Sequence, residues 1–368
     1  MTARFRLRQA LVIARLELKR VFLARRSLWI YGLAMLPALL FFVHALQLRY
    51  ELRQARQGGA VAPAVLESIE TGMSEQQVLD LAGKPGQDRQ RTIYRSSRRE
   101  EQGKEIVESR EVRTRRMVYF DGSRRAYLWF EDGRLRSKEV QPVLNFAEDR
   151  EVYAGVFQYF YLRLAIFFGC LGIFLNLFRG EMMDKTLHFW LLAPARREVL
   201  LAGKFLAGWA AASVVFTGGA MLAFAAMLWP HFGAGAEAYW QGPGAMHAAR
   251  YALAALMGCA GYGSLFLAAS LWIRNPIVPA AVLLLWEASS GFLPELLQKL
   301  SVLYYLQSLC PVPAPMEADV PTLLKLLLAP AAPLPPWLAV AGLSAFSALV
   351  LWAAAAGARR IEINYSTD

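Results

Sequence analysis

Long apolar runs constrain this chain more than any other feature of its sequence. Four runs carry no charged side chain, at 27–46, 205–230, 251–273 and 337–357. Two more are interrupted by one charge each, Arg163 within 152–178 and Glu287 within 276–293. A helix of about 20 apolar residues crosses a bilayer, and a soluble domain does not contain several such runs. The sequence therefore predicts an α-helical membrane protein with six transmembrane helices.

The six predicted spans divide the chain into segments of different character. They occupy residues 27–48, 151–178, 205–230, 250–273, 275–296 and 336–358. The remaining segments are an amphipathic helix at 1–26, an extracytoplasmic domain at 49–150, a loop at 179–204, short or re-entrant outer helices at 297–335 and a tail at 359–368.

The distribution of charge predicts how the chain is oriented. The net charge is +11, and residues 1–30 hold eight Lys and Arg but a single acid, Glu17. Loops rich in Lys and Arg stay in the cytoplasm, so the N-terminus is predicted to be cytoplasmic. Six spans return the C-terminus to the same side. Because the basic residues follow the membrane topology, they do not indicate a nucleic-acid partner.

The segment before the first span is amphipathic. On a helix, one face carries Leu7, Leu11, Ala14, Leu18 and Phe22, and another carries Arg8, Arg15, Lys19 and Arg26. A basic amphipathic helix next to a span favours the membrane surface, where its arginines contact lipid headgroups. The alternative is a short soluble helix without a special role.

Residues 49–150 are rich in charge and predict a small α+β domain on the outer side. Ser74 and Gln77 form a capping-box pattern, which predicts a helix that starts at Ser74, buries Val78 and Leu81, and stops at Gly83. Asp-Gly pairs at 121–122 and 132–133 separate strand-like runs, as in an antiparallel meander.

The stretches "TGMSEQQVLDLAGKP" at 71–85 and "YLWFEDGRL" at 127–135 resemble the small lipoproteins of the BamE/SmpA type. That resemblance covers only this insert. It implies interactions with another envelope protein rather than catalysis, and the lipidation cysteine of those lipoproteins is absent here.

The sequence contains no motif for catalysis or nucleotide binding. It has no P-loop, no His-Glu-x-x-His and no Gly-x-Ser-x-Gly, and its four histidines are scattered. Cys170, Cys259 and Cys310 have no spacing typical of zinc sites or disulfides and are predicted to be free thiols. We therefore expect no catalytic residue, metal or cofactor in this chain.

The loop at 179–204 carries the clearest pattern. It contains Arg179-Gly180-Glu181, Lys185-Thr186-Leu187, Pro194, Arg197-Glu198 and Gly203-Lys204. This order resembles the cytoplasmic loop of ABC-2 type transporter permeases, with Lys185 where that family usually has glycine. The resemblance extends to the amphipathic helix, the six spans and the short helices before the last span, and leaves out the insert at 50–150.

The resemblance implies that the loop forms a coupling helix held by a separate ATP-binding subunit. Acids near its start and arginines near its end suit the helix dipole, and three apolar side chains suit a cleft on a partner. The residues implied in docking are Glu181, Asp184, Thr186, Leu187, Phe189, Trp190, Arg196 and Arg197. The alternative is a solvated hairpin, which leaves the exposed apolar residues unexplained.

The same resemblance implies the partners and the location. Two ATP-binding subunits would bind ATP and magnesium, and a second copy of the permease or a paralogue would complete the membrane pathway. The chain would lie in bacterial inner-membrane lipid and act in export.

Arg163 and Glu287 are predicted to lie near the bilayer midplane, each about 17 Å deep. A lone charge there costs several kcal/mol, so the two side chains would pair with each other or face a polar conduit. Alternatively, Arg163 extends outward to the interface and Glu287 is protonated.

Two other classes of function remain open. An envelope scaffold would use its spans as an anchor and its outer domain to recruit a periplasmic protein. A membrane enzyme would make a chemical product without any ATPase, and no motif favours it.

Overall fold

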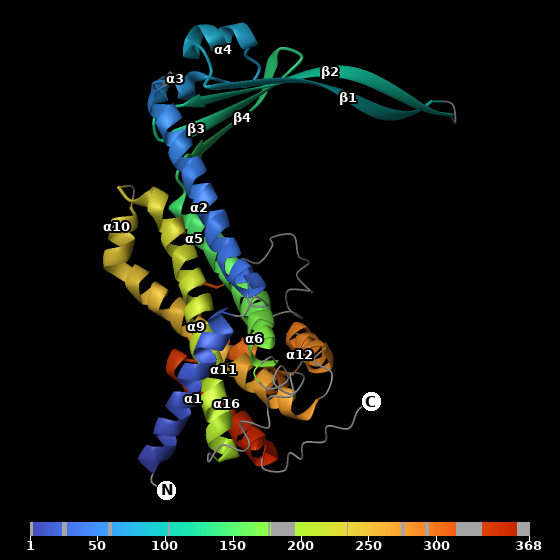
Figure 1. The fold of residues 1–368 in the computed structure, drawn as a ribbon. Helices are drawn as coiled ribbons and strands as arrows, with labels where there is room; N and C mark the ends of the chain where they lie inside the picture. Colours follow the sequence, from blue (N-terminus) through green and yellow to red (C-terminus); the bar gives the residue numbers. More distant parts are fainter. Residues whose placement is uncertain are drawn as a thin grey trace. The chain divides into compact units, whose positions relative to one another are not determined.

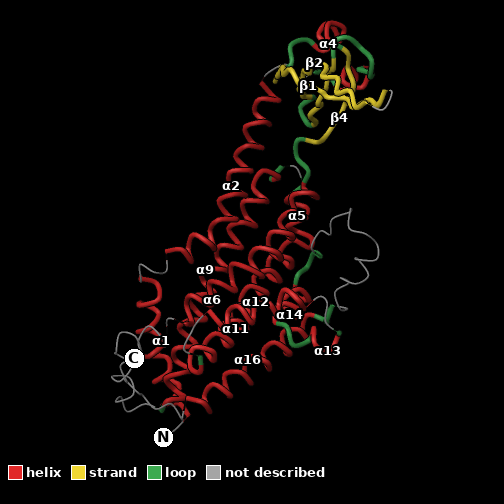
Figure 2. The backbone as a smooth tube through the Cα atoms, turned by 90° about the vertical axis from the view of Figure 1, so that its right-hand side faces the viewer, coloured by secondary structure: helices red, strands yellow, loops and turns green. Residues whose placement is uncertain are grey.

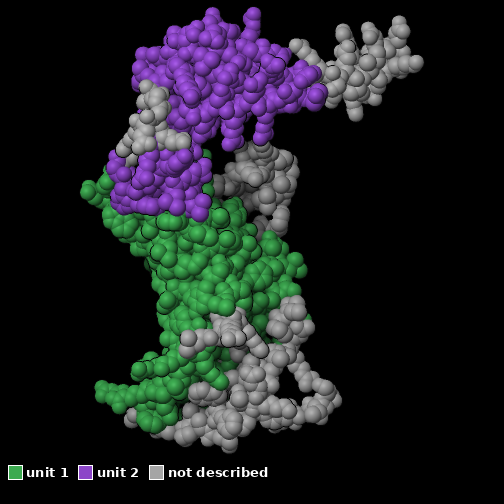
Figure 3. All heavy atoms as spheres, turned by 45° about the horizontal axis from the view of Figure 1, so that its top comes forward, with its two compact units in different colours: residues 1–42, 147–228, 235–368 green, residues 43–146, 229–234 purple. Residues whose placement is uncertain are grey.

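The computed structural model describes residues 3–23, 28–57, 61–101, 104–175, 177, 196–233, 235–273, 277–290, 294–313 and 333–358. These residues form two compact units. Unit 1 comprises residues 1–42, 147–228 and 235–368, and unit 2 comprises residues 43–146 and 229–234 (Figure 3).

Unit 1 is helical (Figures 1 and 2). Its elements begin with α1 (Ala3–Leu23), the first half of α2 (Leu28–Gln57), α5 (Phe146–Gly155), the π-helix η2 (Val156–Ala165) and α6 (Ile166–Leu175). They continue with α9 (Arg197–Leu228), α10 (Ala236–Tyr239), the π-helical turn η5 (Trp240–Gly244) and α11 (Ala245–Trp272). The last are α12 (Ile277–Ser289), α13 (Glu295–Gln298), α14 (Val302–Leu309) and α16 (Pro336–Ala358).

Five described helices are long and apolar enough to cross a membrane. They are Leu28–Arg53, Phe146–Leu175, Arg197–His231, Ala236–Trp272 and Pro336–Ala358. Within the fifth predicted span, 275–296, the structure describes the 13-residue helix α12, about 20 Å long, and the start of α13. The flanks of α12 at 274–276 and 291–293 lie outside the described residues. The mostly helical membrane architecture is confirmed, whereas the count of six spans stays a prediction.

Helix α11 lies at the centre of unit 1, where it packs against α6, α9, α14 and α16. An aromatic cluster fills the space beside its first half. Tyr251 of α11 meets Tyr153 and Phe157 edge to face, with ring centroids 5.1 and 4.7 Å apart, and Phe224 of α9 meets Tyr153 at 5.1 Å. Tyr153 donates a hydrogen bond to the carbonyl of Ala220, which provides its buried hydroxyl with an acceptor.

Helix α2 approaches α9 at Gly219. A Cβ atom at this position would lie 2.4 Å from the carbonyl oxygen of Ala34. The hydroxyl of Tyr161, from η2, donates to the same carbonyl oxygen at 2.9 Å. The two backbones can come this close only because residue 219 has no side chain.

Unit 2 is a small α+β domain, as predicted. Its elements are the second half of α2, α3 (Pro63–Ser68), α4 (Glu75–Ala82), β1 (Gln87–Glu101), β2 (Lys104–Phe120), β3 (Arg124–Glu131) and β4 (Arg134–Pro142). The strands form one antiparallel sheet in the order β1-β2-β3-β4, which confirms the predicted meander. Only the last part of β2, from Thr114, pairs with β3, so the β1–β2 hairpin extends past the other strands (Figure 1).

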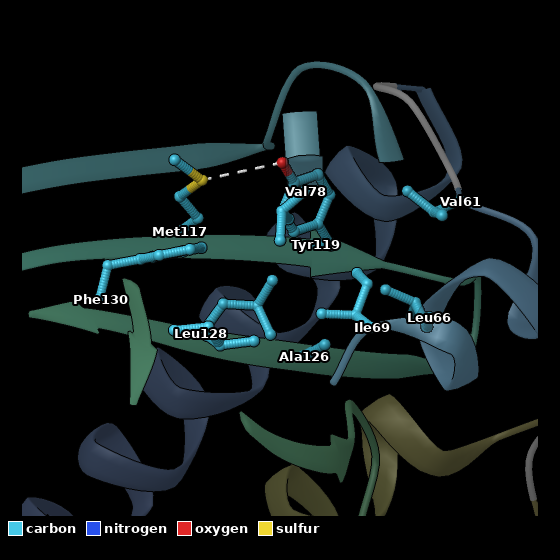
Figure 4. Close-up of a cluster of buried hydrophobic side chains, with 10 residues drawn as sticks. Val61, Leu66, Ile69, Val78, Met117, Tyr119, Ala126, Leu128 and Phe130 are labelled. Carbon is cyan, nitrogen blue, oxygen red and sulfur yellow. Dashed lines mark hydrogen bonds between the residues drawn. The ribbon is translucent and has the colours of Figure 1, made fainter. Parts of the chain in front are cut away.

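The core of unit 2 lies between one face of the sheet and the helices α3 and α4 (Figure 4). The predicted capping box is present, because the Ser74 side chain accepts from the N–H of Gln77 and the Gln77 side chain accepts from the N–H of Ser74. Val78 is fully buried, but Leu81 is 49% exposed, so its predicted burial was wrong. Leu79 packs against the core instead.

The two Asp-Gly pairs form turns, as predicted. Asp132 and Gly133 both have positive φ values, 48° and 80°, and join β3 to β4 through a two-residue loop. Asp121 fixes the other turn with its carboxylate, which accepts hydrogen bonds from the backbone N–H groups of Ser123 and Arg124 and from the Arg124 guanidinium.

Asp121 gives the domain a testable dependence on pH. Burial acts to raise its pKa, but hydrogen bonds from Arg124 and Ser123 outweigh burial and hold the pKa below the ordinary value. A lowered folded-state pKa stabilises the fold above the unfolded pKa of about 4, and this stabilisation is lost as the pH falls through the folded value. Asp121→Asn should therefore lower the free energy of unfolding at neutral pH by about 1–2 kcal/mol.

Urea unfolding of fragment 60–145, followed by circular dichroism at neutral pH and again well below the pKa of an aspartate, checks this expectation. The deficit of Asp121→Asn should shrink at acid pH, and the exposed Asp80→Asn serves as the control. A deficit of the same size at both pH values would mean that the charge of Asp121 contributes nothing.

Candidate functional site

Most of the predicted docking residues lie outside the described residues, namely Glu181, Asp184, Thr186, Leu187, Phe189 and Trp190. The structure describes the end of the predicted loop. Arg196 precedes α9 and its carbonyl accepts from the N–H groups of Val199 and Leu200. Arg197 begins α9 and donates to the carbonyl of Ala358, the last residue of α16. A guanidinium group at a helix C-terminus is favoured by the helix dipole.

A buried ion pair joins α1 to α9 at the last residue of the predicted loop, Lys204. Lys204 Nζ lies 2.7 Å from Glu17 Oε1 and donates a second hydrogen bond, 2.8 Å long, to the carbonyl of Leu177. The side chains of Lys204 and Glu17 are 0% and 4% exposed. Each ion alone would lose several kcal/mol of hydration free energy on burial, so the two charges depend on each other.

The surroundings of this pair are closely packed. Ala10 and Ile13 of α1 form a buried apolar cluster with Val199 and Leu200 of α9. A Cβ atom at Gly203 would lie 2.8 Å from the Ile13 side chain and 2.9 Å from the carbonyl oxygen of Ala10. Helix α1 is thus fixed on α9 along its Ala10–Ile13–Glu17 face.

This contact face differs from the one that the apolar pattern of residues 1–26 predicts. Leu7 and Leu11, on the predicted apolar face, are more than half exposed. The face that packs on α9 contains Glu17, which an apolar pattern leaves out because a carboxylate is rarely buried without a partner. One feature of the sequence could have indicated this contact: Glu17 is the single acid among the eight Lys and Arg of residues 1–30. Because Leu7 and Leu11 are exposed, they are accessible for the predicted contact with lipid, which stays a prediction.

No direct ion pair joins Arg163 to Glu287 among the residues that the structure describes, and their predicted pairing stays a prediction. Glu287 of α12 instead accepts hydrogen bonds from the hydroxyl of Ser301 (2.5 Å) and from the backbone N–H groups of Val302 (3.0 Å) and Leu303 (3.3 Å). The first N–H groups of a helix have no partner within the helix. The buried carboxylate of Glu287 therefore caps the N-terminus of α14.

The other end of α14 is capped by a cation. Arg250 of α11 donates to the backbone carbonyls of Ser308, Leu309 and Cys310, at 3.4, 3.0 and 3.3 Å. Negative charge at the N-terminus and positive charge at the C-terminus both suit the dipole of α14. This short helix is held between charges that two other helices supply. Sequence patterns did not indicate Arg250 or Ser301, because neither lies in a recognisable motif.

Arg163 lies in the π-helix η2, and its guanidinium carbon is 5.2 Å from the ring centroid of Tyr159. Within the same π-helix, the Gln158 side chain donates to the carbonyl of Val312, three residues after α14. Wide helical turns of this kind are rare and often occur at functional sites. Because η2 also contacts α14, it belongs to the same cluster as the two caps.

Comparison with known proteins places these features in a family. A family model described as "ABC-2 family transporter protein" matches residues 11–309. The chain belongs to the ABC-2 transporter family. No curated protein and no solved structure matches it.

The match covers both charged clusters of this ABC-2 permease, from Glu17 to Ser301. It also runs across unit 2, for which the BamE/SmpA resemblance and the position on the outer side remain predictions. Members of the family are membrane subunits of ABC transporters and typically work with an ATP-binding subunit. The chain is therefore a multi-pass membrane permease and a transport subunit.

Other chemistry has little support in this permease. Among the residues that the structure describes, no group of three or more His, Cys, Asp or Glu side chains could hold a metal ion. Cys170, Cys259 and Cys310 are free thiols, and the first two are buried. The hydrogen bonds of Arg197 and Lys204 join the start of α9 to α16 and α1.

Proposed function

We propose that this chain forms the membrane pathway of an ABC exporter that a separate ATP-binding subunit drives. ATP binding and hydrolysis would occur in the partner. The permease would convert movement of that partner into a change between inward-facing and outward-facing arrangements of its helices.

The observation that carries this proposal is the anchoring of the first turns of α9. The helix begins at Arg197, within the loop 179–204 whose pattern resembles a coupling helix. Within its first eight residues it bonds to α16 through Arg197 and to α1 through Lys204. A push on the loop would therefore reach three helices at once. A hairpin without a role in coupling has no need for such attachments.

Several finer features belong to the same proposal. Two ATP-binding subunits would dock on two permease chains, either identical copies or paralogues. The chain would lie in the bacterial inner membrane with both termini in the cytoplasm, and segment 275–296, which contains α12, would complete a sixth crossing. The docking contacts would be made by the loop residues Glu181, Asp184, Thr186, Leu187, Phe189, Trp190, Arg196 and Arg197.

Substitutions in the loop test the proposal. Leu187→Asp and Trp190→Asp would each bury a carboxylate in the docking cleft, which costs several kcal/mol without a hydrogen-bond partner. The double variant should insert into the membrane but retain less than about a tenth of the co-purifying ATPase, since 1.4 kcal/mol corresponds to tenfold. The measurement is the ratio of ATPase to permease after purification in detergent.

Two controls make this measurement specific. Tyr94→Asp also replaces an aromatic residue with a carboxylate, but at an exposed position of the outer domain, and should leave the ratio unchanged. Glu181→Ala should have a mild effect, because a charge at a helix end contributes about 1 kcal/mol or less. Full retention of the ATPase by the double variant would refute the coupling-helix assignment.

A second candidate is an envelope scaffold that recruits a periplasmic protein through its outer domain. The separate hydrophobic core of unit 2 favours a binding role for that domain. ATPase activity of the assembled complex separates the two candidates, because only a transporter requires hydrolysis to depend on this chain.

A further inference from the structure

The sheet of unit 2 has two chemically different faces. Met117 and Leu128 lie on the face that α3 and α4 cover. Side chains alternate along a strand, so Arg116 and Trp129 lie on the opposite face. The register places Arg116 between Arg89 of β1 and Trp129 of β3. Two cations and an indole therefore lie side by side across three strands.

Helix α2 covers one end of this second face. Its residue Leu52 packs there against a cluster made of Val118, Phe120 and Val143. Glu51, also from α2, forms an ion pair with Arg125 on the same face. The part of the face that carries Arg116 lies beyond this contact.

The uncovered part is hollowed. A hollow of about 240 Å³ is lined by Arg89, Arg91, Thr114, Arg115, Arg116 and Trp129. Trp129 is 42% exposed, and the Arg116 guanidinium carbon lies 5.4 Å from its ring centroid. The ring thus fixes the position of one cation and still has surface to offer a ligand.

Most of the positive charge around this hollow is not compensated. Arg115 bonds to Glu75 and Asp88, at 2.6 and 2.5 Å. Arg89, Arg91 and Arg116, in contrast, have no carboxylate partner among the residues that the structure describes. Like charges directly opposite each other destabilise a sheet, as at the pair Arg89↔Arg116. A bound anion would remove this repulsion.

Two carboxylates of the same face whose side chains the structure describes have other partners. Glu131, which pairs with Thr114 in the register, binds Arg136 at 3.4 Å. Glu139 accepts a hydrogen bond from the side chain of Gln141.

We propose that this hollow is a binding site for a soluble phosphate-bearing molecule about one ring in size. Guanidinium groups bind phosphate through paired, charge-assisted hydrogen bonds, and an indole offers an apolar surface for a ring. Sites for drug-sized ligands measure about 300–1,000 Å³, so a hollow below that range fits one ring with its phosphate rather than a larger molecule.

Binding to the full-length permease in phosphatidylcholine nanodiscs tests this proposal by calorimetry. The probes are inositol monophosphate, inositol, which lacks the charge, and inorganic phosphate, which lacks the ring. The monophosphate should bind most tightly and inositol should not bind. Arg116→Gln and Arg89→Gln should each weaken binding of the monophosphate about tenfold or more. Trp129→Ala should remove the preference for the monophosphate over inorganic phosphate.

Arg113→Gln is the matched control, because it removes the same charge from β2 at a position that the alternation puts on the opposite face. If Arg113→Gln and Arg116→Gln weakened binding of the monophosphate equally, the effect would come from the net charge of the domain, and the proposed site would be wrong. No binding of the monophosphate to the unmodified protein would also overturn it. If phosphatidylglycerol in the nanodiscs abolishes binding, the phosphate belongs to a lipid headgroup and the assignment to a soluble ligand is wrong.

Discussion

Lys204→Met is expected to destabilise the permease by about 3–5 kcal/mol, because it leaves the buried carboxylate of Glu17 without its cation. Glu17→Gln should have an effect in the same direction, since Lys204 would lose the opposite charge beside it. The double variant Glu17→Leu with Lys204→Met should recover most of the loss, because an apolar pair of similar volume often replaces a buried ion pair without cost.

The measurement is the thermal unfolding midpoint of the purified permease, together with the ATPase activity of the assembled complex. Lys19→Met is the control, since Lys19 is an exposed lysine of the same helix α1. If the double variant were as unstable as the sum of the single variants, Glu17 and Lys204 would not interact. If the double variant were stable but its assembled complex had lost ATPase activity, the ion pair would be needed for coupling rather than for folding.

Glu287→Ala is expected to release the N-terminus of α14. The substitution removes the acceptor of two backbone N–H groups and of the Ser301 hydroxyl in a buried environment. Each unsatisfied buried group costs about 1–3 kcal/mol, so local stability should fall by about 3 kcal/mol or more. Hydrogen exchange is measured in the full-length permease and read from the proteolytic peptide that covers 294–313. The α14 amides should exchange over a hundredfold faster, because each 1.4 kcal/mol of lost stability corresponds to a tenfold change in the opening equilibrium.

Arg163→Gln is the control for this experiment. Arg163 makes no hydrogen bond to Glu287 or to α14 among the residues that the structure describes, so its loss should change the exchange of α14 far less than the loss of Glu287 does. An equal acceleration in Arg163→Gln would mean that charge at a distance, rather than the hydrogen bonds of Glu287, holds the N-terminus of α14. Unchanged exchange in Glu287→Ala would mean that α14 is held by its apolar contacts with α11 and α16 alone.

Local patterns carried most of the fold that could be predicted. Five of the six predicted spans correspond to long apolar helices, because a membrane helix forms its hydrogen bonds within itself. The helix at Ser74 and the turn at Asp132-Gly133 could be predicted because their determinants lie within four residues of one another. The loop pattern at 179–204 was enough to indicate the ABC-2 family, to which the chain belongs.

The candidate site could not be predicted in the same way. Glu17 and Lys204 are 187 residues apart, and Glu287 binds a helix that begins 15 residues later. No local rule says which of several charged residues will meet. The predicted pairing of Arg163 with Glu287 rested on their equal depth in the bilayer. Depth fixes only one of three coordinates, and Glu287 accepts its hydrogen bonds from closer donors at the start of α14. The basic hollow depends on strand register, which the sequence left open.

The two caps of α14 also set a limit on how this segment can vary in length. The helix has eight residues, about 12 Å, between a carboxylate on α12 and a guanidinium on α11. Inserting one residue would lengthen it by about 1.5 Å and rotate one end by about 100° relative to the other, so one cap would lose its target. A whole extra turn would restore the orientation but lengthen the helix by about 5.4 Å, so tolerated insertions and deletions should be confined to the connections on either side of α14.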